Sequence, residues 1–400
     1  MRVVIVGAGQ AGAALAAKLR ALGHQGEIVM LGDEPAPPYQ RPPLSKAYLL
    51  GEMGEERLWL RSPDFWTENA VELRLGQPVT GLDPVARTVT VGGEVLAYDH
   101  LALATGSTPR RLPAAIGGDL GGVYTVRSLA DVDAMRAEFQ PSRRVIIVGG
   151  GYIGLEAAAV ASKLGLQVTV LEMAPRILQR VASAETSTHV RALHRSHGVT
   201  ILEETGLDRL EGTSRVTGAL LKDGRVLPAD FVIVGVGVTP NTQLAEAAGL
   251  SLENGISTDA FGRTSDPAIW AAGDCASFPW KGGRLRLESV GNAIDMAEAV
   301  AANILGAGQP YEAKPWFWSD QFNLKLQIAG LNTGYDHIAT RPGEGEAVSF
   351  WYYRGETLLA VDAMNDARAY MVGKRLIEGG KSPSPDTIAT TPDLKALLKA

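Results

Sequence analysis

The feature that most constrains the fold is a pattern that occurs twice: an apolar strand, a glycine turn and an Ala/Leu-rich helix. The two copies begin at Val3–Gly12 and Val145–Gly154. Each contains G-x-G-x-x-G between a strand and a helix, which is the context that a dinucleotide-binding unit requires. The glycines permit a tight turn and a close approach to a pyrophosphate. We therefore predict two nucleotide-binding units, with contacts from Gly7, Gly9, Gly12 and Gly151.

The rest of each half follows the same plan. A second strand is expected at 27–31 and at 167–172, and each half closes on a further apolar strand with a glycine turn, at 101–106 and 231–237. This order of strands and helices is typical of a parallel sheet with crossover helices. The fold class predicted is α/β, with two Rossmann-like dinucleotide-binding domains.

The chain changes character after Pro315. Aromatic, strand-like stretches occupy 316–328, 348–353 and 357–363, and a helical pattern runs from Asp366 to Glu378. We read this part as a C-terminal α+β domain at 316–400, with an extended segment at 381–392 and a short amphipathic helix after it. Residues 1–110 and 240–315 are then expected to form the first, discontinuous dinucleotide-binding domain, and 111–239 the second.

The end of the second strand of each unit should carry an acid for the ribose. In the second unit this acid is Glu172. A carboxylate here accepts hydrogen bonds from ribose hydroxyls and repels a 2′-phosphate, which favours NADH over NADPH. Arg176 could counter this preference, but we expect it to cap or solvate the loop. In the first unit the matching position is Gly32, and Asp33 is assigned to the ribose.

Composition excludes several classes of protein. Apolar residues make up 46% and charged residues 20% of the chain, which is ordinary for a globular protein, and the net charge of −6 argues against general nucleic-acid binding. No apolar run reaches the length of a membrane span. A strand at the very start leaves no room for a signal peptide, so we expect a cytoplasmic protein. The one cysteine, Cys275, permits no internal disulfide and is expected to be buried.

The order of the two motifs indicates which nucleotide each unit binds. A complete unit at the N-terminus favours FAD there and a nicotinamide nucleotide in the second unit. The stretch Thr264–Asp274 reads as a strand ending in Gly-Asp, which would place the Asp274 carboxylate against a polyol such as the ribityl chain. A plain surface turn is the alternative.

Several motifs together resemble a known family. They are Pro38–Lys46, Ala104–Gly106, Gly149–Glu156, Gly273–Cys275, Glu288–Val290 and Pro315–Gln321. From Arg2 to about Ala363 the chain closely resembles the FAD-dependent NADH–ferredoxin reductases of bacterial oxygenase systems, of the putidaredoxin reductase and biphenyl-dioxygenase reductase type. These belong to the glutathione-reductase-like superfamily.

The resemblance implies a set of site residues. For FAD it implies Ala11, Asp33, Arg41, Lys46, Val79, Arg127, Asp274 and Val290. For NADH it implies Gly151, Tyr152, Ile153, Glu156, Glu172 and Gly237. Lys46 near the flavin could stabilise negative charge on the reduced ring, and Glu156 could pair with it and bind the carboxamide. Trp316 and Trp318 share a strand face, where core packing and a role beside the flavin or the partner are equal alternatives.

Two further observations bear on function. Disulfide reductases of the superfamily carry a cysteine pair and its NADH oxidases one cysteine near the flavin, but Leu44–Lys46 contains none. Electrons are thus expected to pass directly to an outside acceptor, a [2Fe–2S] ferredoxin that serves a cytochrome P450 or a ring-hydroxylating dioxygenase. Rubredoxin is a close alternative; an NADH oxidase and an apoptosis-inducing-factor-like flavoprotein are weaker ones. His189, His194 and His197 are expected on a solvated helix face rather than at a metal site.

Overall fold

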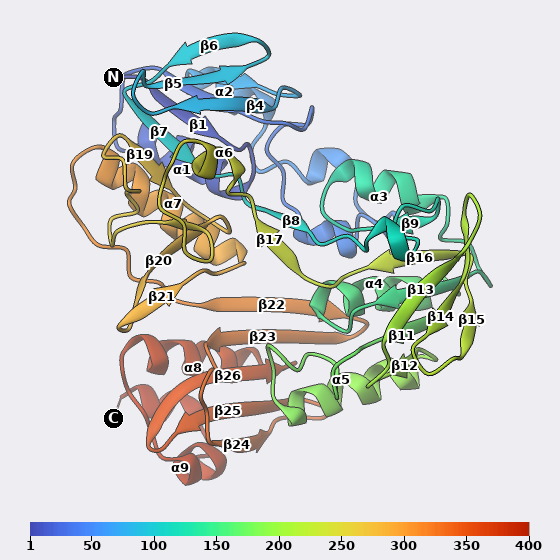
Figure 1. Ribbon diagram of the computed structural model, residues 1–400. Coiled ribbons are helices and arrows are strands. Elements are labelled where there is room, and N and C mark those ends of the chain that lie inside the picture. Colours follow the sequence, from blue (N-terminus) through green and yellow to red (C-terminus); the bar gives the residue numbers. More distant parts are fainter. Residues whose placement is uncertain (400) are drawn as a thin grey trace. The chain divides into compact units, whose positions relative to one another are not determined.

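The computed structural model describes residues 1–399 (Figure 1). Its internal contacts divide the chain into two compact units. The first unit contains Met1–Gln40, Glu55–Thr108 and Val238–Pro315. The second contains Arg41–Gly54, Pro109–Gly237 and Trp316–Ala400. The Pro-rich segment that precedes Lys46 is thus divided between the two units. No helix within residues 1–399 combines the length and the apolar character needed to cross a membrane.

The first unit is built on a five-stranded parallel sheet. Its order is β19 (Ile269–Ala271), β7 (His100–Leu103), β1 (Val3–Val6), β2 (Ile28–Leu31) and β3 (Val71–Arg74). Helices α1 (Gln10–Ala21) and α7 (Val290–Ile304) pack against each other (Figure 1). Every residue of β1 and β2 is buried, as expected where both faces of a parallel sheet are covered.

Smaller elements complete the first unit. They are α2 (Pro63–Glu68), the antiparallel sheet of β4 (Val79–Asp83), β5 (Thr88–Val91) and β6 (Glu94–Ala97), helix α6 (Gln243–Ala247), and the strands β18 (Ile256–Ser257), β20 (Ala276–Trp280) and β21 (Gly283–Leu285). Strands β8 (Ser107–Pro109) and β17 (Val238–Pro240) pair where the chain passes from one unit to the other.

The second unit repeats the same core. Its parallel sheet has the order β12 (Thr200–Leu202), β11 (Gln167–Leu171), β10 (Arg144–Val148), β16 (Phe231–Val234) and β9 (Val123–Tyr124), with helices α3 (Leu129–Arg136), α4 (Tyr152–Lys163) and α5 (Ala184–Ser196). Val145 lies between Val168 and Phe231 as Val3 lies between Ile28 and His100. The predicted duplication is therefore confirmed strand by strand. A small antiparallel sheet of β13 (Leu207–Gly212), β14 (Val216–Leu221) and β15 (Val226–Pro228) is added to it.

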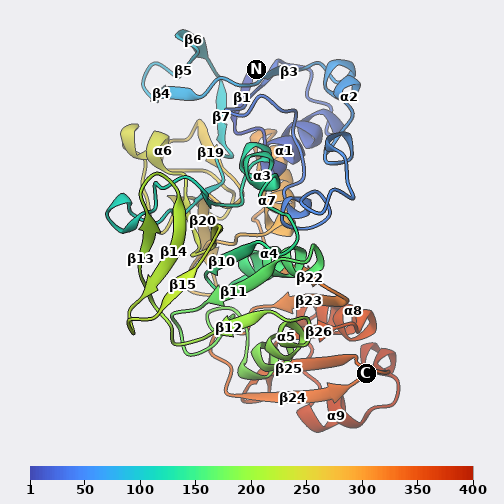
Figure 2. The same ribbon diagram turned by 90° about the vertical axis from the view of Figure 1, so that its right-hand side faces the viewer.

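The C-terminal part of the second unit is a five-stranded antiparallel sheet (Figure 2). Its order is β22 (Trp316–Gln321), β23 (Leu324–Gly330), β26 (Thr357–Met364), β25 (Val348–Arg354) and β24 (His337–Pro342), followed by α8 (Ala367–Glu378), α9 (Pro385–Thr390) and the 3-10 helix η4 (Leu394–Leu398). This confirms an α+β domain. The stretch 316–328 is a hairpin rather than one strand, and β24 was not predicted.

The expectation of an extended segment at 381–392 is wrong. Helix α9 occupies Pro385–Thr390 within it. The Ser384 side chain caps the helix by accepting a hydrogen bond from the N–H of Thr387, and Pro385 takes the first helical position. Serine followed by proline is a helix-start signal that the Ser/Thr/Pro composition of the segment obscured.

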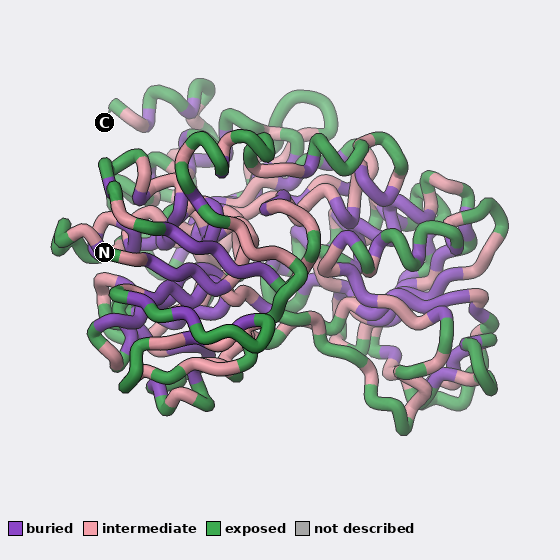
Figure 3. The backbone as a smooth tube through the Cα atoms, turned by 90° about the horizontal axis from the view of Figure 1, so that it is seen from above, coloured by how far each residue is buried: buried purple, intermediate pink, exposed green. Residues whose placement is uncertain are grey.

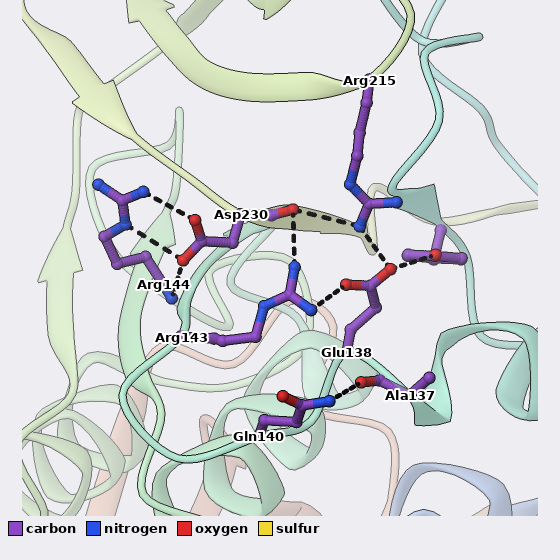
Figure 4. A network of polar contacts seen from close by, with 8 residues as sticks. Ala137, Glu138, Gln140, Arg143, Arg144, Arg215 and Asp230 are labelled. Carbon is purple, nitrogen blue, oxygen red and sulfur yellow. Dashed lines mark hydrogen bonds and ion pairs between the residues drawn. The ribbon is translucent and has the colours of Figure 1, made fainter.

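The second parallel sheet has a buried centre and a polar edge at the amino ends of its strands. All of β16 is buried, and so is β10 after its first residue, Arg144. Figure 3 shows how buried residues gather along extended segments of the backbone while loops are exposed. At the amino edge lies a polar network (Figure 4). Arg144 binds Asp230 through Nε and one terminal guanidinium nitrogen, and Arg143 and Arg215 bind Glu138. The bond from Arg144 lowers the pKa of Asp230 to about 2. Ion pairs therefore line the amino edge, whereas ligands of such sheets bind outside the carboxyl ends of the strands.

Candidate functional site

The first glycine turn is a close-packed junction with an open centre. A Cβ on Gly7 would lie 2.1 Å from the carbonyl oxygen of Ala104, and one on Gly12 would lie 1.9 Å from that of Gly7. A Cβ on Gly9 would meet nothing within 4 Å. The outer glycines are therefore required by packing between β1, α1 and β7, whereas Gly9 borders free space at the start of α1.

The second turn has the same geometry. A Cβ on Gly149 would lie 2.3 Å from the oxygen of Gly235, one on Gly154 would lie 2.2 Å from that of Gly149, and Gly151 again faces free space. Neither α1 nor α4 has a side-chain N-cap. The N–H groups of each first turn, which have no partner within the helix, thus border an open cradle. Both cradles fit the pyrophosphate of a dinucleotide.

The Glu172 carboxylate lies directly against the second cradle. One oxygen accepts a hydrogen bond from the N–H of Gly150 at 2.8 Å, and the other accepts one from Ala174 at 2.7 Å. Two backbone donors fix the acid at the end of β11. A ribose beside this turn would meet a carboxylate whose position is fixed by these two hydrogen bonds.

Arg176 is directed into its own loop. Its guanidinium donates to the carbonyl oxygens of Ser183 at 2.9 Å and Ala182 at 2.8 Å, and to the hydroxyl of Ser187. The expectation that it caps the loop is confirmed. Its donors are used by the protein, so the Arg176 guanidinium is turned away from the Glu172 carboxylate and toward its own loop.

The first unit places its acid one residue later for a steric reason. A Cβ on Gly32, the position that matches Glu172, would lie 2.8 Å from the Cβ of Ala8. No side chain fits there, and Asp33 follows in an exposed position. Asp274 follows β19 at the carboxyl edge of the same sheet, and its carboxylate accepts a hydrogen bond from Ser107 at 2.8 Å. A Cβ on Gly273 would lie 3.0 Å from that of Ala11, so Asp274 adjoins the first turn.

Large apolar side chains are exposed around the second turn. Ile153 at the start of α4 is 44% exposed, Met173 after β11 is 72% exposed and Val236 after β16 is 37% exposed. All three follow the carboxyl ends of neighbouring strands, where an apolar surface suits the flat rings of a nucleotide. Sequence reasoning selected Ile153 and missed the other two, although an apolar residue just beyond a buried strand is a signal that could have found them.

Lys46 and Glu156 form an ion pair in the second unit. Lys46 Nζ lies 2.7 Å from Glu156 Oε2, and the Ser45 hydroxyl donates to the same oxygen at 2.5 Å. Ser319 donates to Glu156 Oε1 at 2.7 Å. Glu156 is only 4% exposed, so its charge is compensated by partners rather than by water. The predicted pairing is present, whereas Ser45 and Ser319 were missed because nothing in the sequence links them to Glu156.

Tyr152 and Trp318 differ in their environments. The Tyr152 ring packs on Phe317 with 4.8 Å between centroids, and its hydroxyl is buried without a partner. Burial raises the pKa of Tyr152. Its side chain therefore points into the protein, and only its backbone borders the turn. Trp318 stacks on Trp316 at 5.5 Å, and both are half-buried, so neither belongs to the core.

The remaining residues implied for FAD lie on both units. Val79 begins β4, and Val290 is the first residue of α7, after the Ser289 cap. Both are in the first unit. Arg41 and Arg127 are in the second, where the Arg41 guanidinium donates to the Arg127 carbonyl at 2.7 Å. Gly237 adopts a φ of 97° between the end of β16 and the start of β17.

The expectation of a solvated histidine face is wrong for one member. His194 is fully buried and bonds through Nε2 to Gln321 Oε1 at 2.7 Å. Burial lowers the pKa of His194 to about 4. The cause is packing of this face of α5 on the end of β22. His197 is exposed and His189 half-buried, and within residues 1–399 no group of three potential ligands is arranged to hold a metal. Cys275 is buried, as predicted.

Comparisons with known proteins agree with this geometry. The family model "Pyridine nucleotide-disulphide oxidoreductase" matches residues 1–297, and the model "Reductase C-terminal" matches 316–398. A ferredoxin–NAD(P)(+) reductase of Sphingomonas sp. is 44% identical over 94% of this chain and 92% of its own. A rubredoxin–NAD(+) reductase of Pseudomonas putida is 38% identical over 91% and 96%. The crystal structure of a covalent putidaredoxin reductase–putidaredoxin complex matches with a TM-score of 0.95 and 40% identity, over 100% of this chain and 98% of that one.

Proposed function

The chain belongs to the pyridine nucleotide–disulphide oxidoreductase family, and we propose that it passes electrons from NADH through FAD to a [2Fe–2S] ferredoxin. FAD and NADH are its cofactors. The ferredoxin in turn supplies a cytochrome P450 or an aromatic-ring-hydroxylating dioxygenase. The proposal also places the protein in the cytoplasm, because it draws on NADH there.

One observation carries the proposal: two equivalent glycine cradles in a chain whose single cysteine is buried. Each cradle fits one dinucleotide, and Cys275 lies in the interior with its thiol directed at the carbonyl oxygens of Leu103 and Ala272. FAD supplies hydride acceptance and one-electron donation when it is bound. No thiol of the chain is available to relay these electrons, so they pass to an external acceptor.

The residues of the chain bind and orient rather than react. We assign the ribose of NADH to Glu172 and its pyrophosphate to the turn at Gly151 and Gly237, with Tyr152 contributing backbone and Ile153 an apolar contact. Lys46 supplies positive charge toward reduced flavin, and Glu156 holds Lys46 and receives the carboxamide. For FAD the proposal retains Gly7, Gly9, Ala11, Gly12, Asp33, Arg41, Val79, Arg127, Asp274 and Val290.

The acceptor is tested by NADH-dependent reduction of cytochrome c. We expect slow reduction by the enzyme alone and a large increase on addition of a [2Fe–2S] ferredoxin, whose one-electron centre passes charge to the cytochrome. Rubredoxin, the acceptor in the name of one relative, is the second candidate and is assayed in parallel. A larger kcat/KM for rubredoxin would replace ferredoxin as the partner. Equal rates with and without either protein, accompanied by peroxide formation, would favour an NADH oxidase.

A further inference from the structure

A chain of buried polar side chains leads away from the Lys46–Glu156 pair. Glu156 Oε1 accepts a hydrogen bond from Ser319 at 2.7 Å, Ser319 accepts one from Gln321 Nε2 at 3.0 Å, and Gln321 Oε1 lies 2.7 Å from His194 Nε2. Ser319, Gln321 and His194 are each at most 1% exposed. Ser319 and Gln321 alternate with the tryptophans along β22 and therefore share the opposite face of the strand.

In this series of side chains each residue donates a hydrogen bond to the next, from His194 toward Glu156. Burial lowers the pKa of His194 to about 4, so its ring is neutral near pH 7. Because Gln321 Oε1 can only accept, the proton of the ring lies on Nε2, and Nδ1 is buried without a partner. The Gln321 amide then donates to Ser319, whose single hydroxyl proton is donated to Glu156. The carboxylate is thus the end point of the whole series.

We propose that Ser319, Gln321 and His194 are positioning residues that hold the Glu156 carboxylate in place for hydride transfer from NADH. Oε2 is held by Ser45 and Lys46, but these donors alone would let the carboxylate turn about its own axis. Ser319 fixes the second oxygen, and Gln321 and His194 keep the Ser319 hydroxyl pointed toward it. This inference rests on the proposed function, in which Glu156 meets the nicotinamide carboxamide.

Stopped-flow reduction of the flavin by NADH is the first test. Removing one hydrogen bond to a charged group should make the Ser319→Ala rate constant at saturating NADH about tenfold lower, with a smaller change in the Kd for NADH. Ser319→Thr keeps the hydroxyl and should restore most of the rate. In a Glu156→Ala background, Ser319→Ala should cause no further loss, because its effect passes through the missing carboxylate.

The matched control is Ser349→Ala. Ser349 is a buried serine of the same sheet that accepts a hydrogen bond from Trp351 at 3.0 Å and is not part of the chain to Glu156. This variant should lose stability without slowing flavin reduction. An equal loss of rate in both alanine variants, or a full additional loss in the Glu156→Ala background, would show a merely structural role and overturn the inference.

Nitrogen NMR of the six histidines gives a readout independent of turnover. We expect His194 in the holoenzyme to be neutral with its proton on Nε2, and Gln321→Leu to change this signal. A proton on Nδ1 of His194 would reverse the hydrogen bond between His194 and Gln321 and overturn the inference. If NADH reduces the wild-type flavin but Ser319→Ala is unimpaired, only this inference fails. If NADH does not reduce the wild-type flavin at all, the proposed function fails and the inference with it.

Discussion

For single residues, we propose that charge placement at the second turn sets the choice of coenzyme. Glu172 is fixed by two backbone donors, and Arg176 is bound to carbonyls of its own loop. A 2′-phosphate at the ribose would therefore meet a held negative charge without a nearby free guanidinium from Arg176. The bare Coulomb cost at about 4 Å and an effective dielectric near 20 is on the order of 4 kcal/mol per unit of like charge, before screening and relaxation.

We expect kcat/KM for NADH to exceed that for NADPH by about 10²-fold, equivalent to about 3 kcal/mol. Glu172→Gln should narrow this ratio mainly by improving NADPH, because the charge is removed while an amide oxygen still accepts from the backbone. Steady-state kinetics with both coenzymes measure the ratio. Arg176→Gln serves as the control and should leave it nearly unchanged. Equal use of both coenzymes by the wild type would remove Glu172 as the discriminator.

At the scale of elements, a buried polar contact joins the C-terminal sheet to helix α5. Asp362 of β26 accepts hydrogen bonds from Thr186 of α5 at 2.7 Å and from Tyr352 of β25. Burial raises the pKa of Asp362 to about 6, above its usual value of 3.8. The ionised group therefore destabilises the folded state near neutral pH, and the cost is relieved on protonation.

The sign of this pH dependence can be tested. Because the folded pKa exceeds the unfolded one, the free energy of unfolding should rise as pH falls through about 6 toward 4, by roughly 2–3 kcal/mol from this group. Asp362→Asn, which keeps an oxygen acceptor, should lack that part of the dependence. Urea unfolding of both proteins at pH 8 and pH 5 gives the comparison. Parallel pH profiles for wild type and variant would contradict the assignment.

The same elements show what the sequence could and could not predict. Local patterns predict the two turns and their strands, because the apolar strand, the G-x-G-x-x-G turn and the start of the helix all lie within one short stretch of sequence. The environment of His194 depends on Gln321, and that of Glu156 on Ser319, each more than a hundred positions away. Tertiary packing of α4 and α5 against β22 sets these contacts, and no spacing in the chain encodes them. The hypotheses of a solvated histidine and an extended tail failed for this reason and for an unrecognised helix cap.

For the whole molecule, reduction of the flavin by NADH and delivery of electrons to a protein acceptor can be measured in separate assays. Trp318 is half-buried and stacked on Trp316, in the C-terminal domain that the disulphide oxidoreductase model does not cover. An aromatic side chain that is neither in the core nor at the coenzyme turn is a candidate for the acceptor side. The C-terminal domain would then distinguish the reaction with a protein from the reaction with a small oxidant.

Trp318→Ala should lower ferredoxin-dependent turnover while reduction of ferricyanide by NADH stays near the wild-type rate. The physical reason is that ferricyanide reaches reduced flavin by diffusion, whereas a protein needs a contact surface. Both assays are run on the same FAD-loaded sample. Trp351→Phe, a change at a fully buried tryptophan of the same sheet, is the control for general damage. Equal losses in both assays would assign Trp318 to flavin reduction or to stability.

In the proposed reaction, the two electrons of one NADH leave the protein singly for a one-electron iron–sulfur partner. The most direct measurement is an anaerobic titration in which limiting NADH is added to enzyme with excess oxidised [2Fe–2S] ferredoxin, while the ferredoxin spectrum is recorded. We expect two ferredoxins to be reduced for each NADH consumed, with catalytic enzyme sufficient and NADPH inert on the same timescale. NADH oxidation without ferredoxin reduction, or enzyme that holds the electrons until oxygen is admitted, would rule out ferredoxin as the acceptor.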